Sequence, residues 1–253
     1  TTNNYETATE LGFIDTTKLE SGLACGTEYT RYAWAFNGCG HSSPVTLTQS
    51  TLTFTCGDSM TVGYVAGVAP VYKTVTYGTV SNIPGETSKC WITSNLGADH
   101  QANSVDDATE ASAGWYWQFN RQQGYKHGGI YPEPSWTITA IDENSNWTAG
   151  HDPCALSFGC GWRLPTSTEW TNVDASGNWG DWNGPWNSAL KMHAAGYIAN
   201  STGNLYVRGI WGYYWSSEQA ASISGWEINF GNSNCGVSNG TKAHGFSVRC
   251  IRD

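Results

Sequence analysis

The chain has 253 residues, of which 13% are charged and 13% aromatic, and its formal net charge at pH 7 is -9. This acidic balance excludes a protein that binds a nucleic-acid backbone, because such binding needs clustered Lys and Arg. No apolar run approaches the roughly eighteen residues of a membrane-spanning helix. Many Trp and Tyr residues, with little Leu, Lys and Glu, favour a protein rich in strands and loops.

Residues 1–53 differ in pattern from the rest of the chain. From Thr27 to Asn37, aromatic residues alternate with small or polar ones, which predicts a strand. A turn is expected at Asn37–Gly40 and a second strand at Pro44–Gln49. We therefore expect this segment to be all-β.

The N-terminal segment resembles the last strands of a fibronectin type III sandwich, in which a Tyr-rich strand ends in an Ala-x-Asn-x-x-Gly turn, here Ala35–Gly40. The resemblance makes Thr1–Gly12 a middle strand with its loop, and the opening strands are missing. Half a sandwich is incomplete, with an unpaired edge and an uncovered apolar face. We expect Tyr32, Trp34 and Phe36, or the residues between them, on that face.

Residues 54–253 are expected to form a second domain that mixes strands with short helices. Val62–Val80 predicts two strands around Ala69-Pro70, and Cys90–Leu96 predicts another. Helices are expected at about 113–123, after Thr166 and at Pro185–Ala195, and strands at 213–217, 225–230, 235–238 and 244–251. This mixture gives an α+β fold class.

A capping box marks the start of the helix after Thr166. In the sequence Thr-Ser-Thr-Glu, the Thr166 hydroxyl can accept a hydrogen bond from the Glu169 N–H. The Glu169 carboxylate can in turn accept one from the Thr166 N–H. The pattern predicts that the helix begins immediately after Thr166.

Two Trp-rich motifs about fifty residues apart are the most specific feature of the second domain. The first is Gly-Trp-Arg-Leu-Pro-Thr at 161–166, followed by Glu169-Trp170. The second runs from Tyr-Tyr-Trp-Ser-Ser at 213–217 to Gly-Phe-Ser-Val-Arg-Cys at 245–250. In order and spacing they resemble the major paralogous domain of the Fibrobacter type, a bacterial surface module. The resemblance implies a C-type-lectin-like fold over 54–253 and an extracellular role in display, adhesion or fibre building.

Eight cysteines without Cys-x-x-Cys spacing favour disulfides over a metal site, and hence an oxidising, extracellular location. The pairing is open from sequence alone. We expect Cys25–Cys39 as a local clip, Cys56–Cys90 at the entry to the second domain, and Cys154–Cys250 between the last strand and the domain centre. Cys160 and Cys235 stand where the family pattern does not demand cysteine, and we expect them to pair with each other.

Eight Trp residues of the second domain fall into two groups of four. Four stand in the motifs and are expected to form a buried aromatic centre: Trp162, Trp170, Trp215 and Trp226. The others stand among Gly and Asn on loops, where a platform for a sugar or protein ligand is expected: Trp179, Trp182, Trp186 and Trp211, with Tyr197 and Tyr206.

Calcium-dependent sugar recognition in lectins of this fold uses a Glu-Pro-Asn or Gln-Pro-Asp tripeptide and a Trp-Asn-Asp triplet. Here Glu133-Pro134 is followed by Ser135, and the matching strand reads Trp-Glu-Ile-Asn at 226–229. Both departures remove calcium ligands, so we expect neither this activity nor a cofactor. A structural calcium site is left open, with oxygen ligands from Asp142, Glu143, Asn144, Asn146 and Asp152.

Motifs of catalysis are missing from the sequence. It has no Gly-x-Ser-x-Gly elbow and no helical His-Glu-x-x-His pair. The six histidines do not cluster and are expected at the surface or in turns: His41, His100, His127, His151, His193 and His244. We therefore expect a protein that is not an enzyme.

Short patterns mark candidate glycosylation sites. Asn146, Asn200 and Asn239 begin sequons, most of which would go unused in a bacterium. Thr16 and Ser59 follow Asp residues, which resembles the bacterial O-glycosylation pattern.

Three functions fit these features. The expected one is a subunit of a self-assembling fibre or pilus-like filament, a homo-polymer in which a neighbour's strand completes the half-sandwich. The alternative is a display module, either an adhesin or a retroelement-diversified variable protein. It would recognise a sugar or protein through loops around 197–211, 218–224 and 231–244, which are rich in Gly, Asn, Ser and Tyr. The third is an anchor domain of a larger surface protein.

Overall fold

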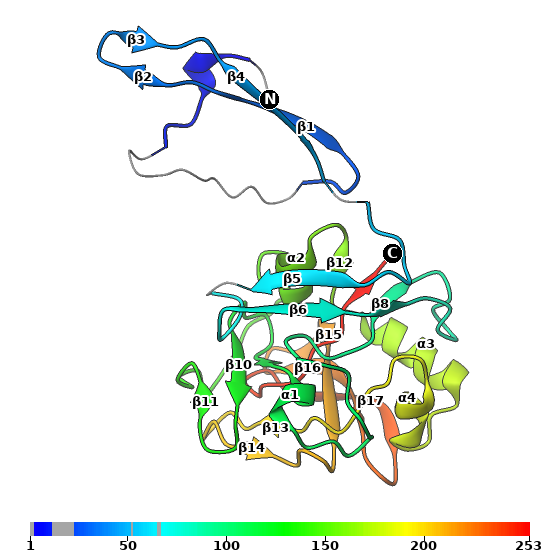
Figure 1. Cartoon of the computed structure of the whole chain (residues 1–253). Helices are drawn as coiled ribbons and strands as arrows, with labels where there is room; N and C mark the ends of the chain where they lie inside the picture. The colour runs from blue at the N-terminus through cyan, green and yellow to red at the C-terminus, as the bar shows by residue number, and fades with distance from the viewer. Residues whose placement is uncertain (1–2, 12–22, 52, 65–66) are drawn as a thin grey trace. The chain divides into compact units, whose positions relative to one another are not determined.

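The computed structural model describes residues 3–11, 23–51, 53–64 and 67–253 of the chain. The chain divides into two compact units, Thr1–Thr55 and Cys56–Asp253, here called the N-terminal and C-terminal units (Figure 1). Among the described residues, no helix combines the length and the apolar character needed to cross a membrane.

A two-stranded antiparallel sheet is the main element of the N-terminal unit. Strand β1 (Glu28–Ala33) pairs with β4 (Val45–Ser50) along the full length of both strands. Between them, β2 (Phe36–Asn37) and β3 (Gly40–His41) form a tight hairpin. The Asn37 side chain accepts a hydrogen bond from the Cys39 N–H at 2.9 Å, which closes the turn expected from the Asn-Gly sequence.

The chain before β1 differs from the expected middle strand. Tyr5–Thr7 forms a 3-10 helix, η1, and the Asn4 side chain caps it by accepting a hydrogen bond from the Glu6 N–H at 3.0 Å. The Tyr5 ring stacks on His41 with the ring centroids 4.0 Å apart. Because such local bonding by Asn competes with strand pairing, the strand expected within Thr1–Gly12 does not form in the part that the structure describes.

The C-terminal unit combines short helices with several small antiparallel sheets and is compatible with an α+β fold. Its helices are α1 (Glu110–Ala113), α2 (Pro153–Phe158), α3 (Ser167–Gly177) and α4 (Asn183–Asn187). Its strands are β5 (Met60–Tyr64), β6 (Lys73–Tyr77), β7 (Thr79–Val80), β8 (Cys90–Ile92), β9 (Tyr116–Trp117), β10 (Gly124–His127), β11 (Pro132–Glu133), β12 (Trp162–Arg163), β13 (Tyr197–Ile198), β14 (Leu205–Tyr206), β15 (Gly212–Ala221), β16 (Ser224–Phe230), β17 (Cys235–Thr241) and β18 (Ile251–Arg252).

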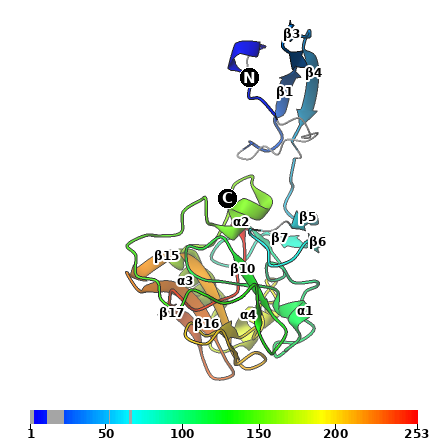
Figure 2. The ribbon, with the colours of Figure 1, turned by 90° about the vertical axis from the view of Figure 1, so that its left-hand side faces the viewer.

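Two sheets organise the core of the C-terminal unit. One has the order β12-β18-β8-β7 and so joins the last strand to strands from earlier in the unit. The other, here called the central sheet, has the order β15-β16-β17, and Figure 2 shows α3 beside it. Trp170 and Val173 of α3 belong to one buried cluster with Tyr214, Ile228 and Phe230 of the central sheet. Since strand side chains alternate between faces, their neighbours along the strands face away from α3.

Helix α3 begins where the capping box predicts. The Thr166 hydroxyl accepts a hydrogen bond from the Glu169 N–H at 3.1 Å, and the Glu169 carboxylate accepts one from the Thr166 N–H at 2.8 Å. Arg163 donates two further hydrogen bonds to the same carboxylate, at 2.7 and 2.8 Å. The start of α3 is thus tied to β12, which precedes it.

Replacing Thr166 with Ala is expected to destabilise the C-terminal unit by about 1 kcal/mol, because the Glu169 N–H loses its acceptor. Urea unfolding followed by Trp fluorescence measures the loss. Thr171→Ala is the matched control, since Thr171 is exposed within the same helix and donates only a local bond to the Ser167 carbonyl. A loss no larger than that of the control would contradict the role of the cap.

Two expected helices are wrong in extent. At 113–123 the helix α1 has already ended, because Gly114 takes a φ of 70° and the Trp115 and Trp117 N–H groups bond to distant carbonyls. At Pro185–Ala195 only the first residues belong to α4, which ends at Asn187 because the next residue is extended. In both places, tertiary hydrogen bonding or backbone geometry overrides helical periodicity.

Of the four Trp residues expected in the core, Trp162, Trp170 and Trp215 are buried and Trp226 is partly exposed. The Trp91 and Trp170 rings lie with their centroids 5.2 Å apart, which links β8 to α3. Alternation along β16 places Trp226 on the same face as Ile228 and Phe230, but Trp226 lies outside the buried cluster that these two residues form with α3.

Six of the eight cysteines are disulfide-bonded. Cys56 pairs with Cys90, and Cys154 pairs with Cys250. The expected pairs Cys25–Cys39 and Cys160–Cys235 are wrong, because Cys39 and Cys235 are free thiols while Cys25 and Cys160 are disulfide-bonded. Cys39 is exposed at the β2–β3 turn, and the Cys235 thiol is hydrogen-bonded to the Asp174 carboxyl. The disulfides are consistent with an extracellular protein.

Candidate functional site

The residues predicted to bind a ligand divide into two separate groups. Trp179, Trp182 and Trp186 lie around α4, whereas Tyr197, Tyr206 and Trp211 lie near the outer face of the central sheet. The second group joins Tyr213 and His244 to form a cluster that we call the aromatic face, defined by Tyr197, Tyr206, Trp211, Tyr213 and His244.

Strand register positions the side chains of the aromatic face. Tyr213 of β15 lies opposite Asn229 of β16, and Trp215 lies opposite Glu227. Because residues two apart on a strand share a face, these side chains lie on the side of the sheet away from α3. The strands therefore place a carboxylate and an amide beside the aromatic rings.

Ring contacts hold the aromatic face together. The Tyr197 ring stacks on Tyr206 with centroids 5.7 Å apart and meets Tyr213 edge-on at 5.1 Å. Tyr213 stacks on Trp211 at 6.1 Å and on the buried Phe246 at 5.2 Å. Tyr206 is 43% exposed and the other four members are partly buried. Rigid, half-exposed aromatic side chains of this kind supply contact area at a low cost in conformational entropy.

Glu227 is an ionisable group buried at the aromatic face. Its side chain accepts a hydrogen bond from the Asn229 amide at 3.1 Å, and its second oxygen, Oε2, has no hydrogen-bond partner among the described residues. Burial raises the pKa of Glu227 to about 7, and it also raises the pKa of the neighbouring Tyr213 to about 12. A Cβ atom at Gly240 would lie 2.5 Å from the Phe246 ring, so the glycine lets β17 pass close to that ring.

A buried acceptor without a partner is rare in proteins and marks a position where a ligand can supply the missing donor. At the aromatic face, this acceptor lies beside the half-buried Tyr213 ring. The arrangement can bind a group that presents a hydrogen-bond donor together with an apolar surface.

Replacing Glu227 with Gln is expected to remove a pH-dependent loss of stability. The folded-state pKa of about 7 lies above the unfolded value of 4.5, so wild-type stability falls as the pH rises from 4.5 through 7. Above that range the cost of ionising the buried carboxyl is about 3 kcal/mol. Gln carries no charge, so the variant should match the wild type below pH 4.5 and exceed it by that amount above pH 7.

Urea unfolding at both ends of this pH range measures the difference. Glu133→Gln serves as the control, because the Glu133 side chain is 65% exposed. If Glu227→Gln follows the wild type at every pH, the carboxyl is not held in an unfavourable environment.

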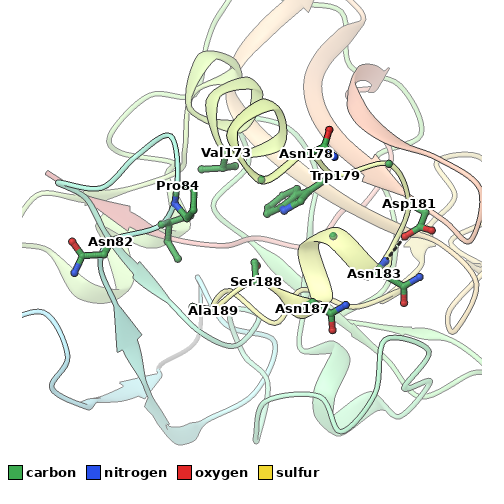
Figure 3. A pocket seen from close by; sticks show the side chains of 14 residues that line it. Asn82, Pro84, Val173, Asn178, Trp179, Asp181, Asn183, Asn187, Ser188 and Ala189 are labelled. Carbon is green, nitrogen blue, oxygen red and sulfur yellow. Dashed lines mark hydrogen bonds between the residues drawn. The ribbon is translucent and has the colours of Figure 1, made fainter.

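The three predicted Trp residues around α4 have different environments. Trp179 is only 8% exposed, and Trp182 is partly buried against the same core cluster. The Lys191 ammonium lies 5.2 Å from the centroid of the Trp186 ring. Trp179 lines a hollow between α3 and α4 (Figure 3), whereas Trp182 and Trp186 do not.

Residues proposed for a structural calcium site have other roles. Asp152 is the N-cap of α2 and accepts hydrogen bonds from three backbone N–H groups, while Glu143 is paired with Arg121 at 3.0 Å. Within the described ranges, no group of three His, Cys, Asp or Glu side chains is placed to hold a metal ion. Asp142, Asn144 and Asn146 are exposed.

The histidines do not cluster, but two of them are buried and not at the surface as expected. His127 and His193 are each 1% exposed. Burial lowers the pKa of His193 to about 3, with the nearby Arg249 as a second cause. His41, His100 and His151 are exposed, and His244 belongs to the aromatic face.

The candidate glycosylation sites differ in exposure. Asn146, Asn239 and Ser59 are exposed. Asn200 is partly buried and its amide donates a hydrogen bond to the Thr139 carbonyl at 3.1 Å. Thr16 lies outside the described residues.

Neither a scan against protein-family models nor a search of curated proteins finds a match. The resemblance to the major paralogous domain therefore rests on the motifs alone. The aromatic face is built partly from those motifs, since Tyr213 and the Phe246 ring on which it stacks belong to the second one.

Sequence reasoning missed Glu227 and Tyr213 as site residues. In the sequence, Glu227 stands out only because it departs from the Trp-Asn-Asp triplet of calcium-dependent lectins. Tyr213 stands out only because it belongs to the second Trp-rich motif. The signal that could have found them is strand alternation, because Tyr213, Glu227 and Asn229 all stand at positions that share one face of the sheet.

Proposed function

We propose that this chain is a non-enzymatic extracellular surface protein of bacterial type, in which a C-type-lectin-like domain is carried on an N-terminal unit that assembles into filaments by strand addition. The disulfides support an oxidising location. The motif pairs at 161–170 and 213–250 support the domain type. The observation that carries the assembly mechanism is the exposure of β4.

Strand β4 is exposed along its whole length. Two of its apolar side chains face solvent, with Val45 70% and Leu47 64% exposed. Among the described residues, β4 has a paired strand on one side only, which is β1. An exposed strand edge with apolar side chains is a template for pairing with another chain.

Hydrogen-bond alternation shows which groups of β4 are available. The Thr51 N–H donates to the Thr27 carbonyl at 3.0 Å, so this pair is of the hydrogen-bonded kind. Hydrogen-bonded and non-hydrogen-bonded pairs alternate along two antiparallel strands. The N–H and C=O groups of Thr46, Thr48 and Ser50 therefore point away from β1. A strand from a neighbouring chain can bond to these groups.

Strand addition of this kind joins two different surfaces of neighbouring subunits. When each subunit contacts the next through unlike surfaces, the rotation between neighbours decides the assembly. The subunits form a closed ring if this rotation closes, and an open filament if it does not. Main-chain hydrogen bonds to the added strand supply affinity, and burial of the Val45 and Leu47 side chains by the neighbouring subunit adds to it. The chain is therefore proposed to be a homo-polymer.

Replacing Thr48 with Pro is expected to prevent assembly. Proline removes an N–H that points away from β1, so pairing with a neighbour is lost while pairing with β1 is kept. Thr48→Ala retains the N–H and is the matched control. In sedimentation velocity at micromolar concentration, the wild type and Thr48→Ala should form large species, and Thr48→Pro should remain a monomer. Large species of Thr48→Pro, or a monomeric wild type, would contradict strand addition at β4.

A second function, a display module, is favoured by the unpaired Glu227 carboxyl oxygen at the aromatic face. We propose that a protein on a cell surface is its ligand, because Tyr-rich faces with adaptable polar neighbours are typical of protein-binding sites. Binding of labelled chain to intact cells tests this proposal. Tyr206→Ala should weaken binding, and Tyr72→Ala should not, because Tyr72 is 77% exposed but is not among the residues of this face. Equal binding by both variants would exclude the aromatic face.

A further inference from the structure

The hollow between α3 and α4 has a volume of about 650 Å³, within the range of small-molecule sites. It is bounded by the loop after β7, the C-terminal end of α3, the following loop and α4 (Figure 3). Figure 3 shows the Trp179 ring between the two helices, with Pro84 across from it. The hollow lies around α4, apart from the rings that form the aromatic face.

The floor of the hollow is apolar and rigid. Ile83 and Val173 are 1% and 0% exposed, and Trp179 is 8% exposed. All three belong to the same buried cluster that holds α3 against the central sheet. Because this floor is part of the core, it is formed before any ligand binds.

The rim of the hollow is rich in amides. Its polar side chains are Asn82, Asn178, Asn183, Asn187, Asp181 and Ser188. The Asp181 carboxylate is held in place because it accepts a hydrogen bond from the Asn183 N–H at 2.8 Å (Figure 3). In the described part of the chain, no Lys, Arg or His lines the hollow.

Trp179 adds an aromatic ring to the floor. Its side chain is 8% exposed and belongs to the buried cluster. A Cβ atom at Gly177 would lie 2.3 Å from the indole nitrogen. The absence of a side chain at Gly177, which also lines the hollow, lets the end of α3 pack closely against the Trp179 ring.

We propose that this hollow binds a neutral saccharide unit without a metal ion. Each Asn amide offers one donor and one acceptor group in a plane, which matches two neighbouring sugar hydroxyls. Asp181 accepts from a hydroxyl, and the apolar floor, which includes the Trp179 ring, packs against the C–H face of a sugar ring. Phosphorylated, sulfated and carboxylated ligands are disfavoured, since the only charge in the lining is negative. The site is independent of strand addition and of the aromatic face.

An array of immobilised neutral glycans and of sulfated or sialylated glycans, probed with the labelled full chain, tests this proposal. We expect retention on at least one neutral glycan, unchanged when a chelator is added. Retention on the anionic glycans alone, loss of binding with the chelator, or no retention on any neutral glycan would overturn it.

Variants locate the binding in the hollow. Asn187→Ala and Asp181→Ala should each weaken binding to the retained glycan about five- to tenfold, the effect of losing one or two hydrogen bonds. Asn144→Ala is the matched control, because Asn144 is exposed and does not line the hollow. Near-ultraviolet circular dichroism checks that each variant is folded. If Asp181→Ala does not fold, Asn187→Ala still tests the site, because Asn187 is exposed on α4. Unchanged binding by the folded variants, or equal weakening by Asn144→Ala, would place the sugar elsewhere.

Discussion

Replacing Arg249 with Met is expected to destabilise the C-terminal unit by about 3–5 kcal/mol, which is a large share of the stability of an ordinary domain. Arg249 is 1% exposed and its guanidinium donates to Asn95 Oδ1 at 2.8 Å. It also donates to the backbone carbonyls of Ile92, Leu190 and Lys191, at 3.1, 2.8 and 3.2 Å. Met fills similar space but removes the donors to these four acceptors, three of them buried and the Lys191 carbonyl part-buried. Each buried acceptor that loses its donor costs about 1–3 kcal/mol.

The same substitution at Arg121 is the control for Arg249→Met. The Arg121 side chain is 29% exposed and pairs with Glu143, a surface ion pair of the kind worth at most about 1 kcal/mol. Denaturant unfolding followed by Trp fluorescence compares the two variants. Equal losses for Arg249→Met and Arg121→Met would mean that Arg249 does not link the segments at 92–95 and 190–191.

Removing the Cys154–Cys250 disulfide by replacing both residues with Ser is expected to cost about 4–5 kcal/mol. The bond spans 96 residues of sequence and both cysteines are fully buried. In the loop-entropy model, a cross-link of this span restricts the unfolded chain by about that amount. It also ties the start of α2 to the residue before β18.

The double replacement at Cys56 and Cys90 provides the comparison. That bond spans 34 residues, and the same model gives it about 3.8 kcal/mol. Unfolding midpoints without reductant should therefore rank the wild type first, the Cys56/Cys90 variant second and the Cys154/Cys250 variant last. A Cys154/Cys250 variant as stable as the wild type would show that the disulfide does not constrain the unit.

Short-range patterns were the part of the fold that sequence could predict. The capping box at Thr166 depends on residues three apart, and the structure has both of its hydrogen bonds. The strands of the central sheet were expected near their observed positions, because period-two alternation and Gly-Asn turns are local signals.

Features that depend on distant partners were predicted poorly. The segment after Gly114 has helical spacing, yet the Trp117 N–H bonds to the Phe246 carbonyl, which is far away in sequence. Likewise, Cys39 and Cys235 look like any other cysteine in the sequence, and only their positions leave them as free thiols. Such outcomes depend on tertiary contacts that spacing does not encode.

The candidate site shows the same limit. Tyr197, Tyr206 and Trp211 were expected to bind a ligand from their composition and loop context, and the structure brings them together. Glu227 was not expected, because its burial and its unpaired oxygen depend on the position of β16 between β15 and β17. Trp179 was expected as an exposed platform but is mostly buried, since its ring also belongs to the core.

Negative-stain electron microscopy of the wild-type chain at micromolar concentration tests strand addition at β4 most directly. An exposed edge with the outward peptide groups of Thr46, Thr48 and Ser50 should recruit a strand from the next chain, and each chain added should offer a new edge. We predict filaments of uniform width. Fields that contain only particles of single-chain size would contradict the assembly proposal, and the display function of the aromatic face would then take its place.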